Sequence, residues 1–231
     1  MIPFHIETLY RHRPVANWAL LGATLLGGAA VCSGLLLPGE TTANFALGGG
    51  NHAALFAHLI APDRIAALVV DLLFLWVAGN AICGLVGQLP FLLLYLALGT
   101  VTGVAQLAIG GSPVLGAGGA VAGMIGLCIA FLPTNTVLLY YPALSGLSAR
   151  PAPVWVLLVY WGGWSALAGL LHLDPTAPWG HLLGLCTGLG LGVAMVLAGW
   201  VEFTECDNGP LIVRHRAQQP GNPEEQGESA P

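Results

Sequence analysis

Two ionisable residues, Asp71 and His181, lie inside long apolar stretches of the sequence. A charge within a membrane helix costs several kcal/mol, so such a residue normally faces the bundle interior and has a partner there. An imidazole can accept a proton from a nucleophile, and a carboxyl group can donate a hydrogen bond when it is protonated. A third apolar stretch opens with the glycine turn Gly116-Ala117-Gly118-Gly119. These residues are the candidates for chemistry in this chain.

The composition indicates a membrane protein. Apolar residues make up 56% of the 231 residues and charged residues only 7%, against roughly 25% charged residues in soluble domains. Lysine is absent, and no basic face of the kind that binds nucleic acid is visible. The five cysteines show no CxxC pair and no spacing with histidine that suits zinc. We therefore predict no nucleic-acid partner, no metal, no other cofactor and no disulfide.

Six apolar stretches approach the roughly 20 residues that a helix needs to cross a bilayer. They cover residues 18–37, 65–86, 89–109, 115–132, 154–171 and 179–201. Because backbone polar groups in lipid must be satisfied within the segment, these stretches are expected to be helices. The sequence thus predicts an all-α membrane protein with a six-helix bundle over residues 18–201. A cytoplasmic segment over residues 1–17 precedes the bundle, and an acidic, disordered cytoplasmic tail over residues 202–231 follows it.

The arginines predict the orientation of the six helices. One side of the membrane receives Arg64 alone, and the other receives Arg11, Arg13, Arg150, Arg214 and Arg216. The positive-inside rule then places both termini in the cytoplasm. In this orientation the second, fourth and sixth helices run inward from the outer surface. Residues near their N-terminal ends therefore share one leaflet, which brings Asp71, Gly118 and His181 to a comparable depth.

Glycines repeat every four residues on three of the predicted helices. They are Gly99 and Gly103 on the third helix, Gly119 and Gly123 on the fourth, and Gly180, Gly184, Gly188 and Gly192 on the sixth. Small residues at this spacing let helix backbones approach closely in lipid. We interpret these stripes as packing surfaces, with the fourth and sixth helices as natural partners.

Two connections are long enough to hold further structure. Part of residues 38–64 is expected to lie in or on the membrane interface, and residues 134–153 form a loop. His52 and His58 are six residues apart in the first connection, which does not specify a metal site, so we interpret both as loop or interface histidines. His172 and Asp174 are expected to be solvated turn residues ahead of the sixth helix.

Three motifs in register resemble the rhomboid intramembrane protease family. Residues Gly116–Gly123 are similar to the family motif G-A-S-G-A-[IV]-x-G, and Trp179–Gly184 with the glycines that follow is similar to A-H-x-x-G-x-x-x-G. Residues Leu72–Asn80 and Gly87 resemble the second helix of the family. The resemblance covers about residues 15 to 200 and implies the six-helix rhomboid fold and a serine endopeptidase ancestry.

The resemblance also implies a Ser–His dyad, in which the serine attacks a carbonyl after the histidine accepts its proton. The histidine corresponds to His181, but the serine position is occupied by Gly118. A family His and Asn on the second helix, which help to hold the oxyanion, correspond to Ala67 and Asp71. The acidic residue near the end of that helix is replaced by Cys83.

A glycine has no nucleophile, so acyl transfer at Gly118 cannot occur. Ser112 lies six residues upstream, and nothing in the sequence places it against His181. An ionised Asp71 would repel an oxyanion and a protonated one could donate to it, and the sequence leaves both forms open. We therefore predict a rhomboid-like pseudoprotease that lies in the lipid bilayer and binds transmembrane segments of client proteins without cutting them.

Other interpretations remain open. The chain could be an active intramembrane serine protease whose nucleophile is altered in this sequence, although Ala67 and Cys83 are further departures from the family. Asp71 and His181 could form a proton or ion relay of a transport protein, although no inverted repeat is visible. They could also form a hydrogen bond that only fixes helix packing. The Ala/Gly/Leu-rich composition without lysine favours a bacterial inner membrane.

Overall fold

The structure is a computed structural model. It describes residues 2–6, 11–33, 44–48, 53–62, 64–110, 114–143, 146–171 and 177–201. The predicted acidic tail lies outside these residues, as do His52, Ser112, His172 and Asp174.

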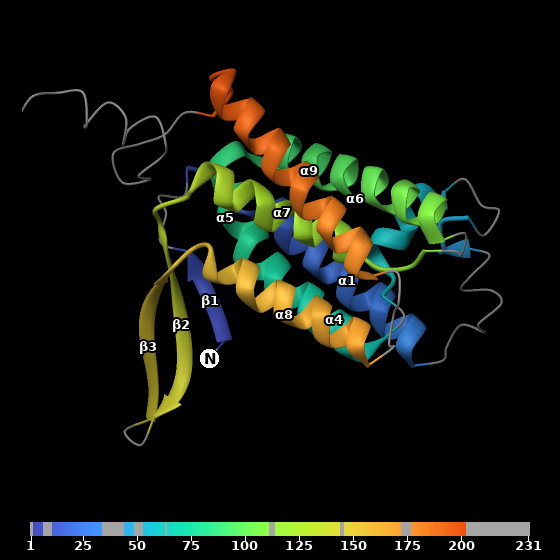
Figure 1. Ribbon diagram of the computed structural model, residues 1–231, viewed down its shortest axis with the longest axis horizontal. Coiled ribbons are helices and arrows are strands. Elements are labelled where there is room, and N and C mark those ends of the chain that lie inside the picture. Colours follow the sequence, from blue (N-terminus) through green and yellow to red (C-terminus); the bar gives the residue numbers. More distant parts are fainter. Residues whose placement is uncertain are drawn as a thin grey trace, which may run out of the picture.

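Within the described residues the helices follow one another in the predicted order (Figure 1). The long helical stretches are α1 (Val15–Cys32), α4 (Ile65–Phe74) with the π-helical turn η2 (Leu75–Gly79) and α5 (Asn80–Val86), α6 (Gln88–Gly110), α7 (Gly118–Phe131), α8 (Val156–Leu170) and α9 (Ala177–Leu197). The connection between α1 and α4 contains the short helix α3 (Ala54–Ala57) and the 3-10 turn η1 (His58–Ile60).

Four helical stretches are long and apolar enough to cross a membrane. They are Val15–Cys32, Ile65–Val86, Gln88–Gly110 and Trp179–Leu197. The apolar helices α7 and α8 are shorter, with 14 and 15 residues. The fourth stretch was predicted to be helical from residue 115, but α7 starts at Gly118, because Gly116 has φ +103°. Glycine reaches that left-handed conformation without strain, and a helix cannot pass through it.

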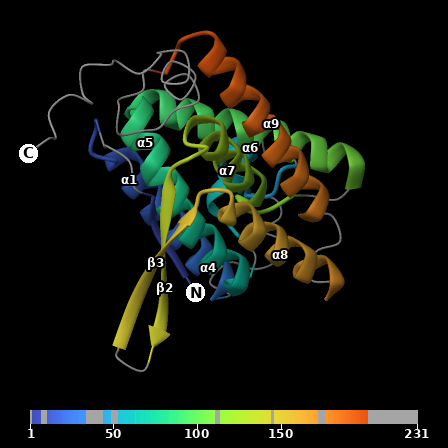
Figure 2. The same ribbon diagram turned by 60° about the vertical axis from the view of Figure 1, so that its left-hand side comes forward.

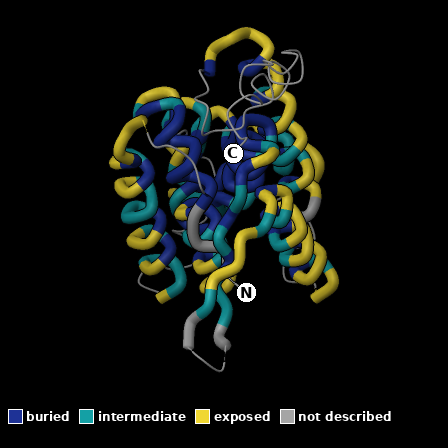
Figure 3. The backbone as a smooth tube through the Cα atoms, turned by 90° about the vertical axis from the view of Figure 1, so that its left-hand side faces the viewer, coloured by how far each residue is buried: buried dark blue, intermediate teal, exposed yellow. Residues whose placement is uncertain are grey.

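Helix α7 forms the centre of the bundle and packs against α9, α6, the stretch Ile65–Val86 and α8 (Figure 1). Figure 3 shows the buried residues in the middle of the bundle and the exposed ones on its outside. The residues of α7 from Ala120 to Cys128 are all buried. A helix that is apolar on every side is expected in such a position. The outer helices expose large apolar side chains, among them Leu26, Leu93 and Leu197, as the sides of a bundle in lipid would.

Helices α7 and α9 approach each other backbone to backbone. A Cβ atom added to Gly184 would lie 2.1 Å from the carbonyl oxygen of Gly119, and one added to Gly188 would lie 2.0 Å from that of Gly123. No other residue type fits at these two positions of α9 without moving the helices apart.

A buried polar pair connects α1 to the helical stretch Ile65–Val86. Asn17 Nδ2 donates to the carbonyl oxygen of Leu75 at 3.0 Å and to Asn80 Oδ1 at 2.9 Å. Leu75 is the first residue of the π-helical turn η2, and a π-helical turn widens the spiral and changes the regular helical hydrogen bonding. The Asn17 amide therefore ties α1 to the middle of the second span.

The structure also contains a small sheet that the sequence did not predict. The strands β1 (Ile2–Ile6), β2 (Thr136–Ala143) and β3 (Gly146–Pro153) are antiparallel in the order β1-β2-β3. Figure 2 shows the β2–β3 hairpin projecting from the bundle. Ile6, Val137 and Leu139 are buried in the core cluster, so the connection that we predicted to be a loop is held by apolar packing and by pairing with the N-terminal strand.

Candidate functional site

The structure brings His181 and Gly118 into contact. Gly118 is the first residue of α7, and His181 lies in the second turn of α9. A Cβ atom built on Gly118 would lie 2.3 Å from His181 Nε2 and 3.0 Å from its Cδ2. The imidazole therefore occupies the space that the side chain of a serine would need.

The hydroxyl of Ser165, on α8, holds the other side of the imidazole. Ser165 Oγ lies 2.6 Å from His181 Nδ1 and donates to the carbonyl oxygen of Trp161 at 2.9 Å. Because the hydroxyl has a single proton and a carbonyl can only accept, Oγ must accept the proton of Nδ1. This assignment, which follows from the hydrogen-bond network, leaves Nε2 unprotonated in the neutral ring and facing Gly118.

Two aromatic rings restrict the movement of the imidazole further. The ring centroids of Trp161 and His181 lie 5.0 Å apart at an interplanar angle of 57°. Phe74 of α4 meets the other side of Trp161 edge-on at 4.9 Å. Both aromatic residues are at most 3% exposed. Residues from α4, α8 and α9 thus fix the position of one imidazole ring.

Asp71 is buried on α4 and is 4% exposed. It interacts electrostatically with Tyr95 of α6, whose hydroxyl donates to the carbonyl oxygen of Leu59 at 3.1 Å. Ala67 lies one turn before Asp71 and offers no polar side chain. Of the two positions that the family resemblance assigns to the oxyanion site, only one therefore carries a group that can form a hydrogen bond.

Two backbone contacts hold the segment that leads into α7. Gly116 N donates to the carbonyl oxygen of His58 at 2.9 Å, and Leu47 and Val114 exchange hydrogen bonds of 2.9 and 3.0 Å. His58 is itself buried, and its Nδ1 donates to the carbonyl oxygen of Ala54 at 2.8 Å. The connection between α1 and α4 is therefore part of the scaffold beneath Gly118.

Burial also lowers the pKa of His58 below its ordinary value of 6.5, because desolvation penalises the charged ring. Its Nε2 is buried without a hydrogen-bond partner and faces Gly103, where an added Cβ would lie 2.7 Å away. We predicted His58 to be a loop or interface histidine, and the structure places it in the protein interior.

Ser165 and Trp161 belong to this site, although we did not predict them from the sequence. The available signal was a hydroxyl in the apolar stretch 154–171, but the sequence does not show which face of α8 meets α9.

Cys83 is buried, and its Sγ donates to Gln88 Oε1 at 3.5 Å. Among the described residues no group of three or more His, Cys, Asp or Glu could hold a metal ion.

The fold and the site define an integral membrane protein, a bundle of apolar helices with a histidine held against a helix N-terminus in its interior. The family model of the Rhomboid domain matches residues 45–198 of the 231, well over half of the chain. This chain therefore belongs to the rhomboid family. The match begins after α1 and extends one residue beyond α9. No protein of curated function matches the chain.

Proposed function

We propose that this rhomboid-family protein is a pseudoprotease, which binds transmembrane segments of client proteins and does not cleave them. The observation that carries the proposal is the contact between Gly118 and His181 Nε2. The position that corresponds to the family nucleophile has no side chain, and the general base fills the space where one would be. An imidazole in that place can accept a proton, but no hydroxyl stands between it and a substrate carbonyl.

The proposal includes six membrane crossings with both termini in the cytoplasm of a bacterium. Pairing of β1 with β2 supports this topology, because the N-terminal strand and the connection between α7 and α8 must then lie on the same side. An even number of crossings therefore separates them. Helix α7 has only 14 residues, but most of them are buried inside the bundle. We count it as a crossing, because a helix that is surrounded by protein need not match the thickness of the lipid.

The central test is proteolysis of a single-span reporter by the purified protein in liposomes. We expect no cleavage by the wild type. Cleavage that disappears in His181→Ala would overturn the proposal. Cleavage that disappears in Ser165→Ala as well would identify the hydroxyl at 2.6 Å from His181 Nδ1 as a relocated nucleophile.

Labelling with a fluorophosphonate probe tests whether the remaining site is competent for acyl chemistry. Gly118→Ser alone is expected to label weakly, because the new Cβ atom displaces an imidazole that Ser165 and Trp161 hold in place. Adding Ser165→Ala frees the ring to move, so the double variant should label faster. Strong labelling of Gly118→Ser alone would show that a single substitution had inactivated an otherwise intact protease.

Client binding requires its own measurement. Fluorescence energy transfer between the labelled protein and labelled single-span helices in liposomes should exceed the transfer to a polyleucine span of equal length. Equal transfer to both would contradict the client-binding part of the proposal and leave the absence of cleavage unaffected.

A further inference from the structure

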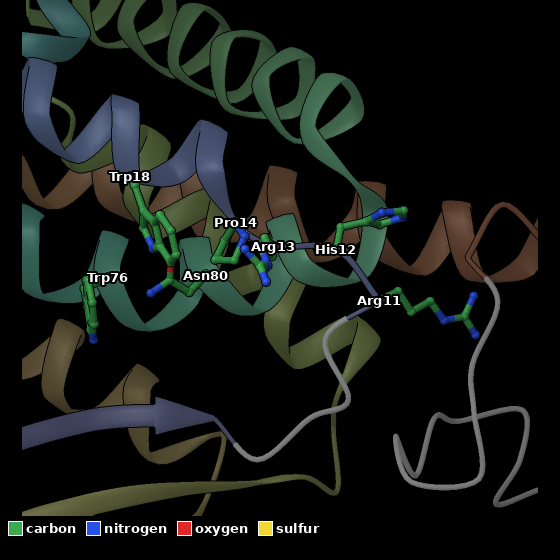
Figure 4. Close-up of a pocket in the computed structure, with 7 residues that line it drawn as sticks. All are labelled: Arg11, His12, Arg13, Pro14, Trp18, Trp76 and Asn80. Carbon is green, nitrogen blue, oxygen red and sulfur yellow. The ribbon is translucent and has the colours of Figure 1, made fainter.

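A cavity of about 370 Å³ lies beside the segment that leads into α1. It is lined by Arg11, His12, Arg13, Pro14, Trp18, Trp76 and Asn80. Figure 4 shows Arg13 beside Pro14 and Asn80, whereas Arg11 extends away from them. None of its lining residues is among those described around His181, and the proposed function does not use the cavity.

Hydrogen bonds hold the backbone of residues 11–16 in place. The amide groups of Arg11 and His12 donate to the carbonyl oxygen of Gly84 at 3.0 and 3.1 Å. Gln88 Oε1 accepts from the amide of Ala16 at 2.7 Å, and Gln88 Nε2 donates to the carbonyl oxygen of Arg13. The backbone of the segment is therefore attached to the corner between α5 and α6.

The chemistry of the walls fits an anionic headgroup with apolar chains. The indole rings of Trp18 and Trp76 are 48% and 40% exposed. Trp18 lies in the first turn of α1, and tryptophan is enriched at the membrane interface because its ring is apolar at one end and polar at the other. Trp76 lies in the middle of the second span, where its ring offers an apolar surface to an acyl chain. Among the described residues, the cavity lining contains two arginines and no acidic residue. A guanidinium group binds a phosphate through two parallel hydrogen bonds, and the nearby N-terminus of α1 adds a partial positive charge.

A second cavity, of about 480 Å³, adjoins the same segment. Arg11 lines this cavity as well, together with Leu85, Val86, Pro90, Met195, Gly199, Trp200 and Val201. Trp200 is 76% exposed. The two cavities thus share Arg11, and each has an exposed indole ring in its wall.

We propose that this region is a binding site for an anionic phospholipid. Arg13 contacts the headgroup phosphate in the first cavity, Arg11 stabilises the negative charge from the second, and the acyl chains run along Trp18 and Trp76. The proposal depends on the membrane location of the chain and not on whether the chain cleaves or binds clients.

The test is a titration of the purified full-length protein in detergent with phosphatidylglycerol and with phosphatidylcholine, followed by native mass spectrometry. We expect phosphatidylglycerol to bind more tightly, and Arg13→Gln to weaken it about fivefold, the loss expected for one basic residue at an anionic membrane surface. Arg13→Lys should retain most of the affinity. Arg150→Gln is the matched control, since Arg150 lies on β3 and contacts Tyr141.

Equal affinity for the two lipids would overturn the proposal, as would an equal loss in Arg13→Gln and Arg150→Gln. Two further experiments test for other occupants of the site. Inorganic phosphate that competes with the lipid at millimolar concentration would show a soluble anion site instead. Loss of the Arg13 dependence after deletion of residues 202–231 would show that the acidic tail occupies the cavity.

Discussion

At the scale of single residues, the missing Cβ atom of Gly118 determines the chemistry of the site. An imidazole can lie against the backbone there only because no side chain intervenes. The same ring accepts no proton at Nδ1, since Ser165 receives the proton that Nδ1 carries. His181 is therefore oriented for proton transfer at Nε2, which faces the backbone of Gly118.

Gly118→Ala is expected to destabilise the protein by about 1–3 kcal/mol, the usual cost of overpacking a tight interior site. Thermal unfolding in detergent micelles measures the change. Gly162→Ala is the matched control, because a Cβ atom there would meet nothing within 4 Å. The control should be neutral or slightly stabilising, since alanine favours helix more than glycine does. Equal melting temperatures for the two variants would show that the imidazole does not fill the position.

Ser165→Ala removes the acceptor of the Nδ1 proton and should cost about 1 kcal/mol, as is typical of one lost hydrogen bond. It should also change the tautomer of His181. The ¹⁵N chemical shifts of the imidazole report this directly: we expect one protonated nitrogen, Nδ1, in the wild type and a mixture in the variant. Ser33→Ala, at an exposed position, should leave the shifts unchanged. Unaltered shifts in Ser165→Ala would contradict the assignment.

At the scale of elements, glycine placement brings α7 and α9 together. At Gly184 and Gly188 the backbone of α9 lies directly against the backbone of α7. This contact tolerates a larger residue less well than a contact between side chains would, because backbone atoms cannot move aside. The π-helical turn η2 and the buried Asn17 amide connect α1 to the same core. The position of His181 relative to Gly118 follows from this packing.

Gly188→Ala should therefore separate α7 from α9 and lower the melting temperature clearly, because the new Cβ atom would lie 2.0 Å from the carbonyl oxygen of Gly123. Gly190→Ala is the matched control, because Gly190 lies two residues further along the same helix and a Cβ atom there would meet nothing within 4 Å. A comparison of the two melting temperatures separates steric packing from helix propensity. If both variants melt at the wild-type temperature, the close contact is absent.

The connection between α1 and α4 makes stability depend on pH through His58. Burial lowers the pKa of this histidine in the folded protein below its value of 6.5, so the unfolded chain binds more protons. Above about pH 6.5 the ring of His58 is neutral in both states and does not reduce the stability of the fold. As the pH falls below that value, protonation favours the unfolded chain and stability is lost. We expect the melting temperature to decrease from pH 7.5 to pH 5, and the decrease to be smaller in His58→Gln. A variant with the same pH profile as the wild type would exclude His58 as the cause.

At the scale of the whole molecule, the small sheet constrains the membrane topology. Because β1 is hydrogen-bonded to β2, the N-terminus and residues 136–153 share one side of the membrane. Alkaline phosphatase fused after residue 145 or at the C-terminus should be inactive in bacteria, since both positions are expected to be cytoplasmic. A fusion between α8 and α9 should be active. Activity of the fusion after residue 145 would contradict the proposed topology.

Much of the molecule could be predicted from local sequence. Apolar stretches predicted where the helices lie, because a helix in lipid must satisfy its backbone within the segment. The motifs around Gly118 and His181 predicted the family, which the match to the Rhomboid domain confirms. The β2–β3 hairpin was missed because its strands are stabilised by pairing with residues 2–6, more than a hundred positions away.

The sequence by itself determined the membrane class, the family and the presence of a glycine at position 118, since each depends on which residues are present and in what order. Only the tertiary structure decided what surrounds His181. This ring belongs to α9, its partners Ser165 and Trp161 belong to α8, and Gly118 belongs to α7. The rotation of these helices about their own axes is fixed by close packing between distant segments, and no local pattern specifies it.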